Sequence, residues 1–336
     1  MEKALRWSNL ILIFLTLLCY VSPFVNPAAF SWFSFLGMAY PWLLLLNVLF
    51  ILLWLVRKEW YFLFSLGCIL IGFNHFKSFV GLEQALPMVE KEWTVLTMNS
   101  MGYQKLKGQV RKEFDQLMAE HQPDIVLLQE GYHGGWPLDK KIYPHRYQPK
   151  DKMLSIHAKR PLSAKGQFDF GNKSNGCIYA DVQLDGQTVR VYNYHLQSNR
   201  VTGDASKLQR EGDLKKRETW VGIRGMLGKV KRAATVRSEQ VKEIIAHAKK
   251  ATHPVILAGD MNDTPLSYTY HCLSQEFVDG FKLRAAGTGT TYDGAIPLLR
   301  IDYIWTDPRL KVRSHDIIKK SFSDHHPVVS RLSLEK

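Results

Sequence analysis

Long uninterrupted runs of apolar residues are confined to the first 80 positions of the chain. Residues 10–25 and 41–56 carry no Asp, Glu, Lys or Arg and come close to the length that crosses a bilayer. The run 60–80 is also apolar, but an asparagine, a histidine and a lysine near its end are compatible with either a span or a partly interfacial segment. We expect it to span, so the pattern predicts a transmembrane region of about three helices over residues 1–80.

The small residues at 26–29 also permit the first run to be interpreted as a cleavable signal peptide. Cleavage there would leave two further hydrophobic segments. The chain is therefore expected to stay anchored in the membrane in either case.

Lysine and arginine flank these runs unevenly. Lys3 and Arg6 precede the first run, Arg57 and Lys58 follow the second, and residues 22–41 between them carry no charge. Positively charged flanks remain in the cytoplasm, so three spans would export everything that follows. We expect an integral protein of a bacterial inner membrane whose remaining domain lies outside the cytoplasm.

After a linker at 81–92, apolar and polar residues alternate in short segments separated by turn residues. An amphipathic helix is predicted at 109–121, and Asp185-Gly186 indicates a hairpin turn. Strands are predicted at 93–100, 124–130, 153–159, 177–184, 188–197, 254–262, 300–307 and 326–334. Many strands with few helices favour two packed sheets flanked by helices over a doubly wound parallel sheet. Residues 93–336 are therefore expected to form one large α/β domain.

A basic, mostly helical insertion is predicted within this domain at about 199–250. It holds 14 Lys/Arg against 6 Asp/Glu. Trp220, Ile223, Leu227 and Val230 recur every three or four residues, as on one face of an amphipathic helix. That face either packs on the domain or lies in the membrane interface, and the sequence gives the two interpretations equal weight.

The charge and cysteine content narrow the choice of partners. A formal net charge of +13 and a pI near 9.4 favour an anionic partner, such as nucleic acid, a lipid head group or a phosphorylated metabolite. Outside the apolar runs only Cys177 and Cys272 remain, without a metal-binding spacing. A zinc site is not expected, and a disulfide between the two is left open.

Polar side chains recur where the predicted apolar strands end. A single carboxylate at such a place is usually a turn former or a helix cap, but so many acid, amide and imidazole groups are hard to explain by turns alone. Oxygen ligands without thiolates suit a hard cation such as Mg²⁺ or Mn²⁺. The residues in question are Asn99, Glu130, His195, Asp260 with Asn262, Asp302, and Asp324 with His325.

At these positions the sequence resembles the endonuclease/exonuclease/phosphatase superfamily, whose fold is that of deoxyribonuclease I. The resemblance extends from Trp93 to the C-terminus and leaves out the apolar region and the basic insertion. It is carried, in the order of the family, by TMN (97–99), LLQE (127–130), NYHLQS (193–198), GDMNDTP (259–265), RIDYIW (300–305) and SDHHP (323–327). It implies a four-layer α/β sandwich and a membrane-anchored bacterial member of the family.

The resemblance also implies a role for each motif residue. Glu130 would be the principal metal ligand, with Asn99 and Asp324 completing or supporting the metal site. Asp260 would orient or deprotonate the attacking water, and Asn262 would hold that water or a phosphate oxygen. His325 would contact the scissile phosphate, Asp302 would fix the tautomer of His325, and His195 would bind a phosphate oxygen or assist the leaving group.

Together these features predict a metal-dependent hydrolase of phosphoester bonds, anchored in the membrane and acting on lipid-linked or other small phosphoesters. A membrane-anchored nuclease is the alternative, because a basic surface also suits nucleic acid. A non-catalytic binding module is a remote third hypothesis. Expected partners are membrane lipids, through the N-terminal helices and the 199–250 insertion, and an anionic substrate; no obligate protein partner is expected.

Overall fold

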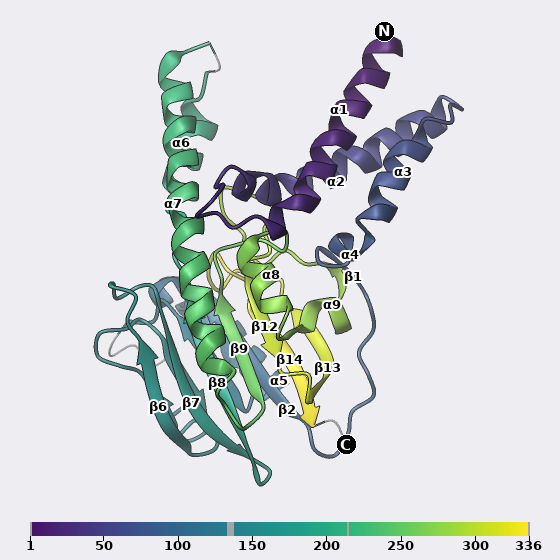
Figure 1. Ribbon diagram of the computed structural model, residues 1–336. Helices are drawn as coiled ribbons and strands as arrows, with labels where there is room; N and C mark the ends of the chain where they lie inside the picture. The colour runs from purple at the N-terminus through teal and green to yellow at the C-terminus, as the bar shows by residue number, and fades with distance from the viewer. Residues whose placement is uncertain (1, 133–137, 214, 335–336) are drawn as a thin grey trace.

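The computed structural model describes residues 2–132, 138–213 and 215–334, and two six-stranded sheets form its centre (Figure 1). The first sheet has the order β10-β12-β9-β8-β7-β6, with β6 Leu162–Phe168, β7 Gly176–Leu184, β8 Gln187–His195, β9 Val255–Asp260, β10 Val278–Asp279 and β12 Asp302–Thr306. The second has the order β13-β14-β2-β3-β5-β4, with β2 Trp93–Asn99, β3 Ile125–Gln129, β4 His145–Tyr147, β5 Ser155–Ala158, β13 Leu310–Ile317 and β14 Val328–Leu334.

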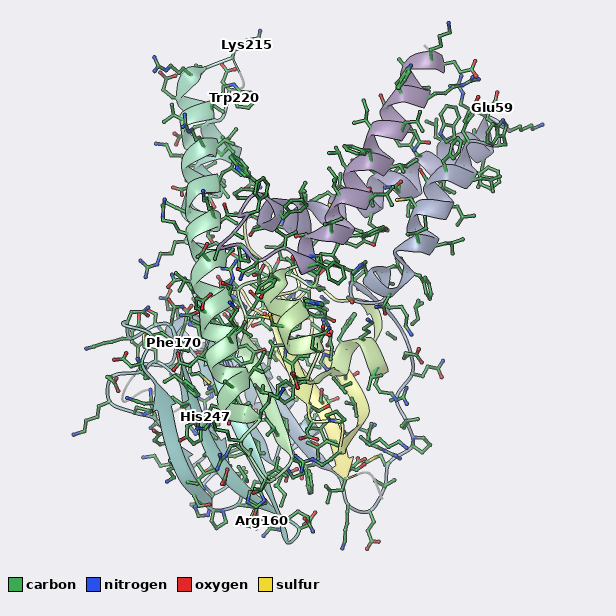
Figure 2. The ribbon with its side chains drawn as sticks, in the orientation of Figure 1. Glu59, Arg160, Phe170, Lys215, Trp220 and His247 are labelled. Carbon is green, nitrogen blue, oxygen red and sulfur yellow. The ribbon has the colours of Figure 1, made fainter. Side chains whose placement is uncertain are left out.

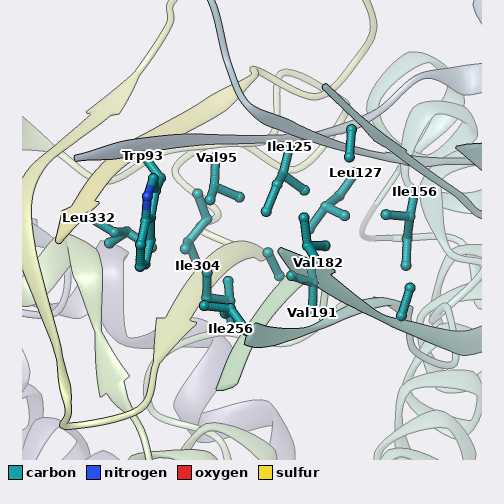
Figure 3. Close-up of a cluster of buried hydrophobic side chains, with 14 of the residues drawn as sticks. Trp93, Val95, Ile125, Leu127, Ile156, Val182, Val191, Ile256, Ile304 and Leu332 are labelled. Atoms are coloured by element: carbon teal, nitrogen blue, oxygen red, sulfur yellow. The ribbon is translucent and has the colours of Figure 1, made fainter. Parts of the chain in front are cut away.

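The two sheets pack face to face over a core of aliphatic side chains (Figure 3). Val95, Ile125 and Leu127 of the second sheet and Val191 and Ile256 of the first are fully buried between them. Alternate residues of each strand point into this layer, as the pleat requires. Burying each of these side chains stabilises the folded protein by roughly 1.5–3 kcal/mol. This packing fixes the position of one sheet relative to the other.

Helices cover both outer faces, which completes the expected four-layer sandwich. Helix α5 (Gly108–His121) buries Phe114 and Leu117 against the second sheet. On the first sheet, α7 (Arg217–Ala248) buries Val241 and Ile244, and α8 (Tyr268–Ser274) buries Leu273. The short α9 (Gly280–Arg284) lies beside β13.

Strand pairing brings the predicted site residues to one edge. The parallel pair β2 and β3 sets Asn99 opposite Gln129, next to Glu130, and the parallel pair β8 and β9 sets His195 opposite Asp260. Antiparallel pairing of β12 with β9 sets Asp302 opposite Asp260 as well. The predicted turn between β7 and β8 is present, with left-handed φ angles of 49° at Asp185 and 82° at Gly186, as a two-residue hairpin turn needs.

The N-terminal region contains α1 (Glu2–Val21), α2 (Phe33–Val56), α3 (Phe62–Ile71) and α4 (Phe73–Phe76), and a short 3₁₀ turn at Ser22–Phe24 follows α1. A second 3₁₀ turn, at Met101–Tyr103, follows β2. The first two helices are long and apolar enough to cross a membrane. The run 60–80, expected to form a third span, is not one continuous helix: α3 has 10 residues, about 15 Å of helix against a hydrocarbon core of roughly 30 Å. Together with α4 it leads the chain from the turn after α2 back toward the α/β domain (Figure 1). The helix is interrupted at Gly72 before α4 begins.

Buried polar side chains join α1, α2 and α3 to one another. Asn9 donates to Ser65 Oγ at 2.7 Å and accepts from the indole of Trp54 at 2.9 Å. Asn47 donates to Thr16 Oγ1 at 2.9 Å. Such interhelical hydrogen bonds are a common way of holding helices together in an apolar surrounding.

The apolar region is docked on the α/β domain rather than tethered by a free linker. The Thr264 hydroxyl donates to the Gly37 carbonyl at 3.3 Å, and Leu266 packs with Tyr40 and Leu44 of α2. Strand β1 (Val80–Leu82), at the start of the expected linker, pairs with β11 (Ala286–Thr288). The N-terminal region therefore contacts the α/β domain at two places, through α2 and through β1.

The basic insertion folds as a hairpin of α6 (Thr202–Glu211) and the first half of α7. The hairpin projects beyond the sheets on the side of the N-terminal helices, with Lys215 and Trp220 near its free end (Figure 2). Of the predicted apolar face, Val230 is buried but Trp220 is 56% exposed. The face does not pack as a unit on the domain.

Gly37 provides a test of the docked arrangement. A Cβ on Gly37 would lie 2.1 Å from the Leu266 carbonyl oxygen, whereas one on Gly67 of α3 would meet nothing within 4 Å. Gly37→Val should lower the thermal unfolding midpoint of the detergent-solubilised protein by several degrees, since overpacking costs about 1–3 kcal/mol. Gly67→Val is the matched control and should unfold like the parent; equal unfolding of both variants would contradict the docking.

Candidate active site

A pocket at the edge shared by the two sheets gathers most of the predicted residues. It is lined by Met38, Glu130, Ser198, Asn199, Arg200, Val201, Thr202, Asp260, Asn262, Tyr292, Ile296, Leu299, Ile301, Asp324 and His325. We refer to it as the catalytic pocket. Its walls come from the ends of strands, from the segment that follows β8, and from helix α2.

The carboxylate of Asp260 is the centre of the polar cluster. It is 1% exposed, and a buried polar group of this kind needs hydrogen-bond partners. Asn99 Nδ2 donates to Asp260 Oδ2 at 3.0 Å, and the Asn262 backbone N–H donates to Oδ1 at 2.8 Å. These bonds fix the orientation of the carboxylate at the pocket.

Two histidine nitrogens approach the same carboxylate. His195 Nε2 lies 3.4 Å and His325 Nε2 lies 3.8 Å from Asp260 Oδ2. The Nδ1–H of His195 donates to the Ser174 carbonyl at 2.8 Å, which fixes the ring and turns Nε2 toward the carboxylates of Asp260 and Glu130.

Asn262 follows Asp260 in the turn after β9 and has a left-handed φ of 54°. Its side-chain Nδ2 donates to the Leu196 carbonyl at 3.1 Å.

His325 and Asp302 form a buried pair behind the pocket. His325 Nδ1 lies 2.9–3.0 Å from both oxygens of the Asp302 carboxylate, so Nε2 is the nitrogen available to the pocket. Burial alone would disfavour the charged imidazole, but the adjacent carboxylates of Asp302, Asp260 and Asp324 outweigh it and raise the pKa of His325 to about 10. The ring is therefore a cation at neutral pH, facing the place where an anion would bind.

The donor set fits a hard divalent cation. Three carboxylates, those of Glu130, Asp260 and Asp324, line the pocket, and carboxylates gathered in this way favour the binding of a cation. None of the described lining residues is a thiol, and the cysteines are free. Oxygen ligands of this kind suit Mg²⁺ or Mn²⁺.

The ion could bind at either of two places in the cluster, beside Asp302 and His325 or beside Glu130. At the first place, single ligand atoms of Asp260, Asp302 and His325 lie within 4.8 Å of one another. Both oxygens of Asp302, however, already face the His325 ring. The side chain of Glu130 is 35% exposed, and Asn99 Nδ2 donates to its Oε1 at 3.0 Å. Glu130 is therefore better placed to meet a hydrated cation.

The eight residues predicted from the sequence fall in one cluster. Glu130, Asp260, Asn262, Asp324 and His325 line the catalytic pocket, whereas Asn99, His195 and Asp302 contact them from behind. The amide of Asn99 presents its nitrogen to the two carboxylates and its oxygen to the Met101 N–H. In this orientation Asn99 supports the ligands.

Sequence reasoning assigned no role to the other lining residues, among them Tyr292, Arg200 and Met38. Tyr292 stacks its ring edge-on to His325 with centroids 5.1 Å apart and shares a hydrogen bond of 3.0 Å with Thr202. Arg200 brings a cation, and Met38 comes from an apolar helix. No motif includes these three: Arg200 follows the NYHLQS motif (193–198) by two residues, whereas Met38 and Tyr292 reach the pocket through the packing of segments distant in sequence.

Sequence comparison covers both parts of the chain. The sequence profile of the Endonuclease/Exonuclease/phosphatase family matches residues 103–325, more than half of the chain. A second profile, described as a domain of unknown function, matches residues 2–79. No curated protein sequence matches the chain.

Solved structures share the fold of the catalytic domain. An endonuclease/exonuclease/phosphatase from Bacteroides vulgatus is 18% identical with a TM-score of 0.54, over 73% of this chain and 100% of that one. A functionally unknown conserved protein from Enterococcus faecalis is 16% identical with a TM-score of 0.51, over 72% and 100%. The chain belongs to the endonuclease/exonuclease/phosphatase family, whose members are metal-dependent hydrolases of phosphoester bonds.

Proposed function

We propose that this hydrolase acts on amphipathic, lipid-linked phosphoesters at the face of a membrane. The observation that carries the proposal is that helix α2 contributes Met38 to the lining of the catalytic pocket. One helical turn further along, Trp42 packs with the same cluster as Met38, formed by Tyr292, Leu299 and Ile301. The pocket thus has a polar floor and an apolar wall built partly by a helix long enough to cross a bilayer.

The polar floor supplies what phosphoester hydrolysis needs. Asp260 would accept a proton from the attacking water, and Asn262 would help to hold that water. His325, cationic and held by Asp302, would stabilise charge on a nonbridging oxygen, and His195 would serve the leaving group. A divalent cation held by Glu130 and Asp324 would supply neutralisation of the phosphate charge.

The apolar wall favours a substrate with a hydrocarbon portion. Met38, Ile296, Leu299 and Ile301 offer no hydrogen bond through their side chains, so a sugar or a polar base gains little from them. An alkyl chain lying along α2 gains about 0.8 kcal/mol for each CH₂ that leaves water. Nucleic acid remains the alternative substrate.

We also propose that the catalytic domain lies outside the cytoplasm. The N-terminus and the turn between α2 and α3 lie at the end of the apolar region away from the sheets (Figure 1), and Glu59 marks that turn (Figure 2). Lys3, Arg6, Arg57 and Lys58 belong to this end, whereas the uncharged segment 22–41 belongs to the end docked on the catalytic domain. The positive-inside tendency favours the basic end in the cytoplasm.

Asp260→Asn should lower kcat by at least about 100-fold while the protein keeps its thermal stability. The amide retains the size of the carboxylate and one hydrogen-bond acceptor, but it cannot take the proton of the water. The rate is measured at saturating Mg²⁺, with Asp316→Asn, an exposed carboxylate on β13, as the control. A kcat for Asp260→Asn within a few-fold of the parent would remove Asp260 from the role of base.

Met38→Gln should impair long-chain substrates selectively. The test uses two pairs of substrates in detergent micelles, each pair differing only in the length of the alkyl chain. The phosphodiesters are 4-nitrophenyl dodecyl phosphate and 4-nitrophenyl methyl phosphate, and the phosphomonoesters are dodecyl phosphate and methyl phosphate. We expect kcat/KM to fall roughly tenfold for the dodecyl compounds, the equivalent of one or two buried methylenes, and to stay within twofold for the methyl compounds. Leu45→Gln, at an exposed position of the same helix, should change neither. A parent enzyme without preference for the dodecyl compounds, or one that prefers plasmid DNA, would refute the lipid proposal.

Alkaline phosphatase, a reporter active only after export, tests the orientation. A fusion after Lys91 should be active and a fusion after Lys58 should be silent. The reverse pattern would put the catalytic domain in the cytoplasm.

A further inference from the structure

We infer that a basic groove beside the catalytic pocket is a second anion-binding subsite, which holds a charged group of the substrate other than the scissile phosphate. The inference rests on the proposed function, since it adds a recognition element to the same substrate. The substrate class is then an amphipathic phosphoester with a second phosphate or similar anion in its head group.

The groove lies between the segment that follows β8 and the projecting half of α7. Its lining holds three cations and amide or hydroxyl donors, and none of the described lining residues is acidic; they are Gln197, Ser198, Asn199, Arg200, Lys229, Arg232, Ala233 and Val236. Its volume is about 380 Å³. Lys229 and Arg232 belong to the insertion that the family motifs do not include.

The groove is continuous with the catalytic pocket. Ser198, Asn199 and Arg200 line both. One molecule can therefore place a phosphoester against Asp260 and His325 and a second anionic group in the groove.

The segment shared by the two cavities is held rigidly. The buried guanidinium of Arg237 donates to the Gln197 carbonyl at 2.8 Å and to Asn199 Oδ1 at 2.9 Å, and it is itself paired with Asp263 at 3.0 Å. Asn199 Nδ2 in turn reaches the carbonyl of Asn262, in the catalytic pocket, at 3.4 Å. The following residue, Arg200, has a left-handed φ of 52°, which is uncommon for a residue other than glycine. The fold thus keeps Arg200 in a strained conformation at the junction of the two cavities.

Two of the three cations are available to a ligand. Lys229 is paired with Asp204 at 2.5 Å. In the part of the chain that the structure describes, the guanidinium groups of Arg200 and Arg232 have no ion-pair partner. A guanidinium matches the oxygens of a phosphate with two parallel hydrogen bonds, which makes it well suited to an anion of this class.

Direct binding measurements test the subsite without depending on turnover. Calorimetry on the full-length protein in detergent with Mg²⁺ compares propane-1,3-bisphosphonate with propylphosphonate, which differ by one anionic group. The parent should bind the bisphosphonate about tenfold more tightly. Arg200→Gln/Arg232→Gln should reduce that ratio to about two, because the second phosphonate loses its charged hydrogen bonds.

Arg224→Gln/Lys231→Gln is the matched control, since it removes two exposed cations of α7 outside the groove. It should leave the ratio unchanged. Equal affinity of the parent for the two probes, or equal loss in both double variants, would overturn the subsite. Failure of the proposed function would give a different result: the protein would not hydrolyse the dodecyl compounds but would still bind the bisphosphonate more tightly than propylphosphonate.

Discussion

A single buried carboxylate sets the demands that the site must meet. Asp260 lies at the end of a central strand with almost no exposure to water, and a charge in that position is stable only when hydrogen-bond donors surround it. Asn99 donates from the other sheet and Asn262 from the turn that follows β9, and the rings of His195 and His325 approach the carboxylate from two further elements. The face-to-face packing of the sheets brings all of these groups to one carboxylate.

The catalytic pocket joins surroundings of opposite character. On one side, Met38 and its neighbours present hydrocarbon; on another, Arg200 and Arg232 present positive charge. The scissile phosphate would bind between them. This arrangement is what recognition of an amphipathic molecule requires, because the two parts of the substrate gain free energy from different walls.

The polar half of the site could be predicted from the sequence because it follows strand ends. Asn99, Glu130 and Asp260 each interrupt an apolar strand, and parallel pairing brings such ends to one edge. Met38 could not be predicted, because within an apolar helix it resembles any residue that faces lipid. Its place depends on the contact of Gly37 with Leu266, which links segments more than 200 positions apart. The strand pattern likewise predicted the two sheets. Asn74, His75 and Lys77 marked the end of the run 60–80 as polar, but the sequence did not show that the helix would break at Gly72.

Helix α2 forms part of the catalytic pocket, so a label at position 38 should lie near the bound metal. A nitroxide can be attached at position 38 by Met38→Cys, in a protein that also carries Cys272→Ser, and its spectrum recorded with and without Mn²⁺. We predict that Mn²⁺ broadens the signal at position 38, that Glu130→Gln weakens the effect, and that a label introduced by Gly67→Cys is unaffected. A signal at position 38 that stays sharp at Mn²⁺ concentrations sufficient for hydrolysis would contradict the claim.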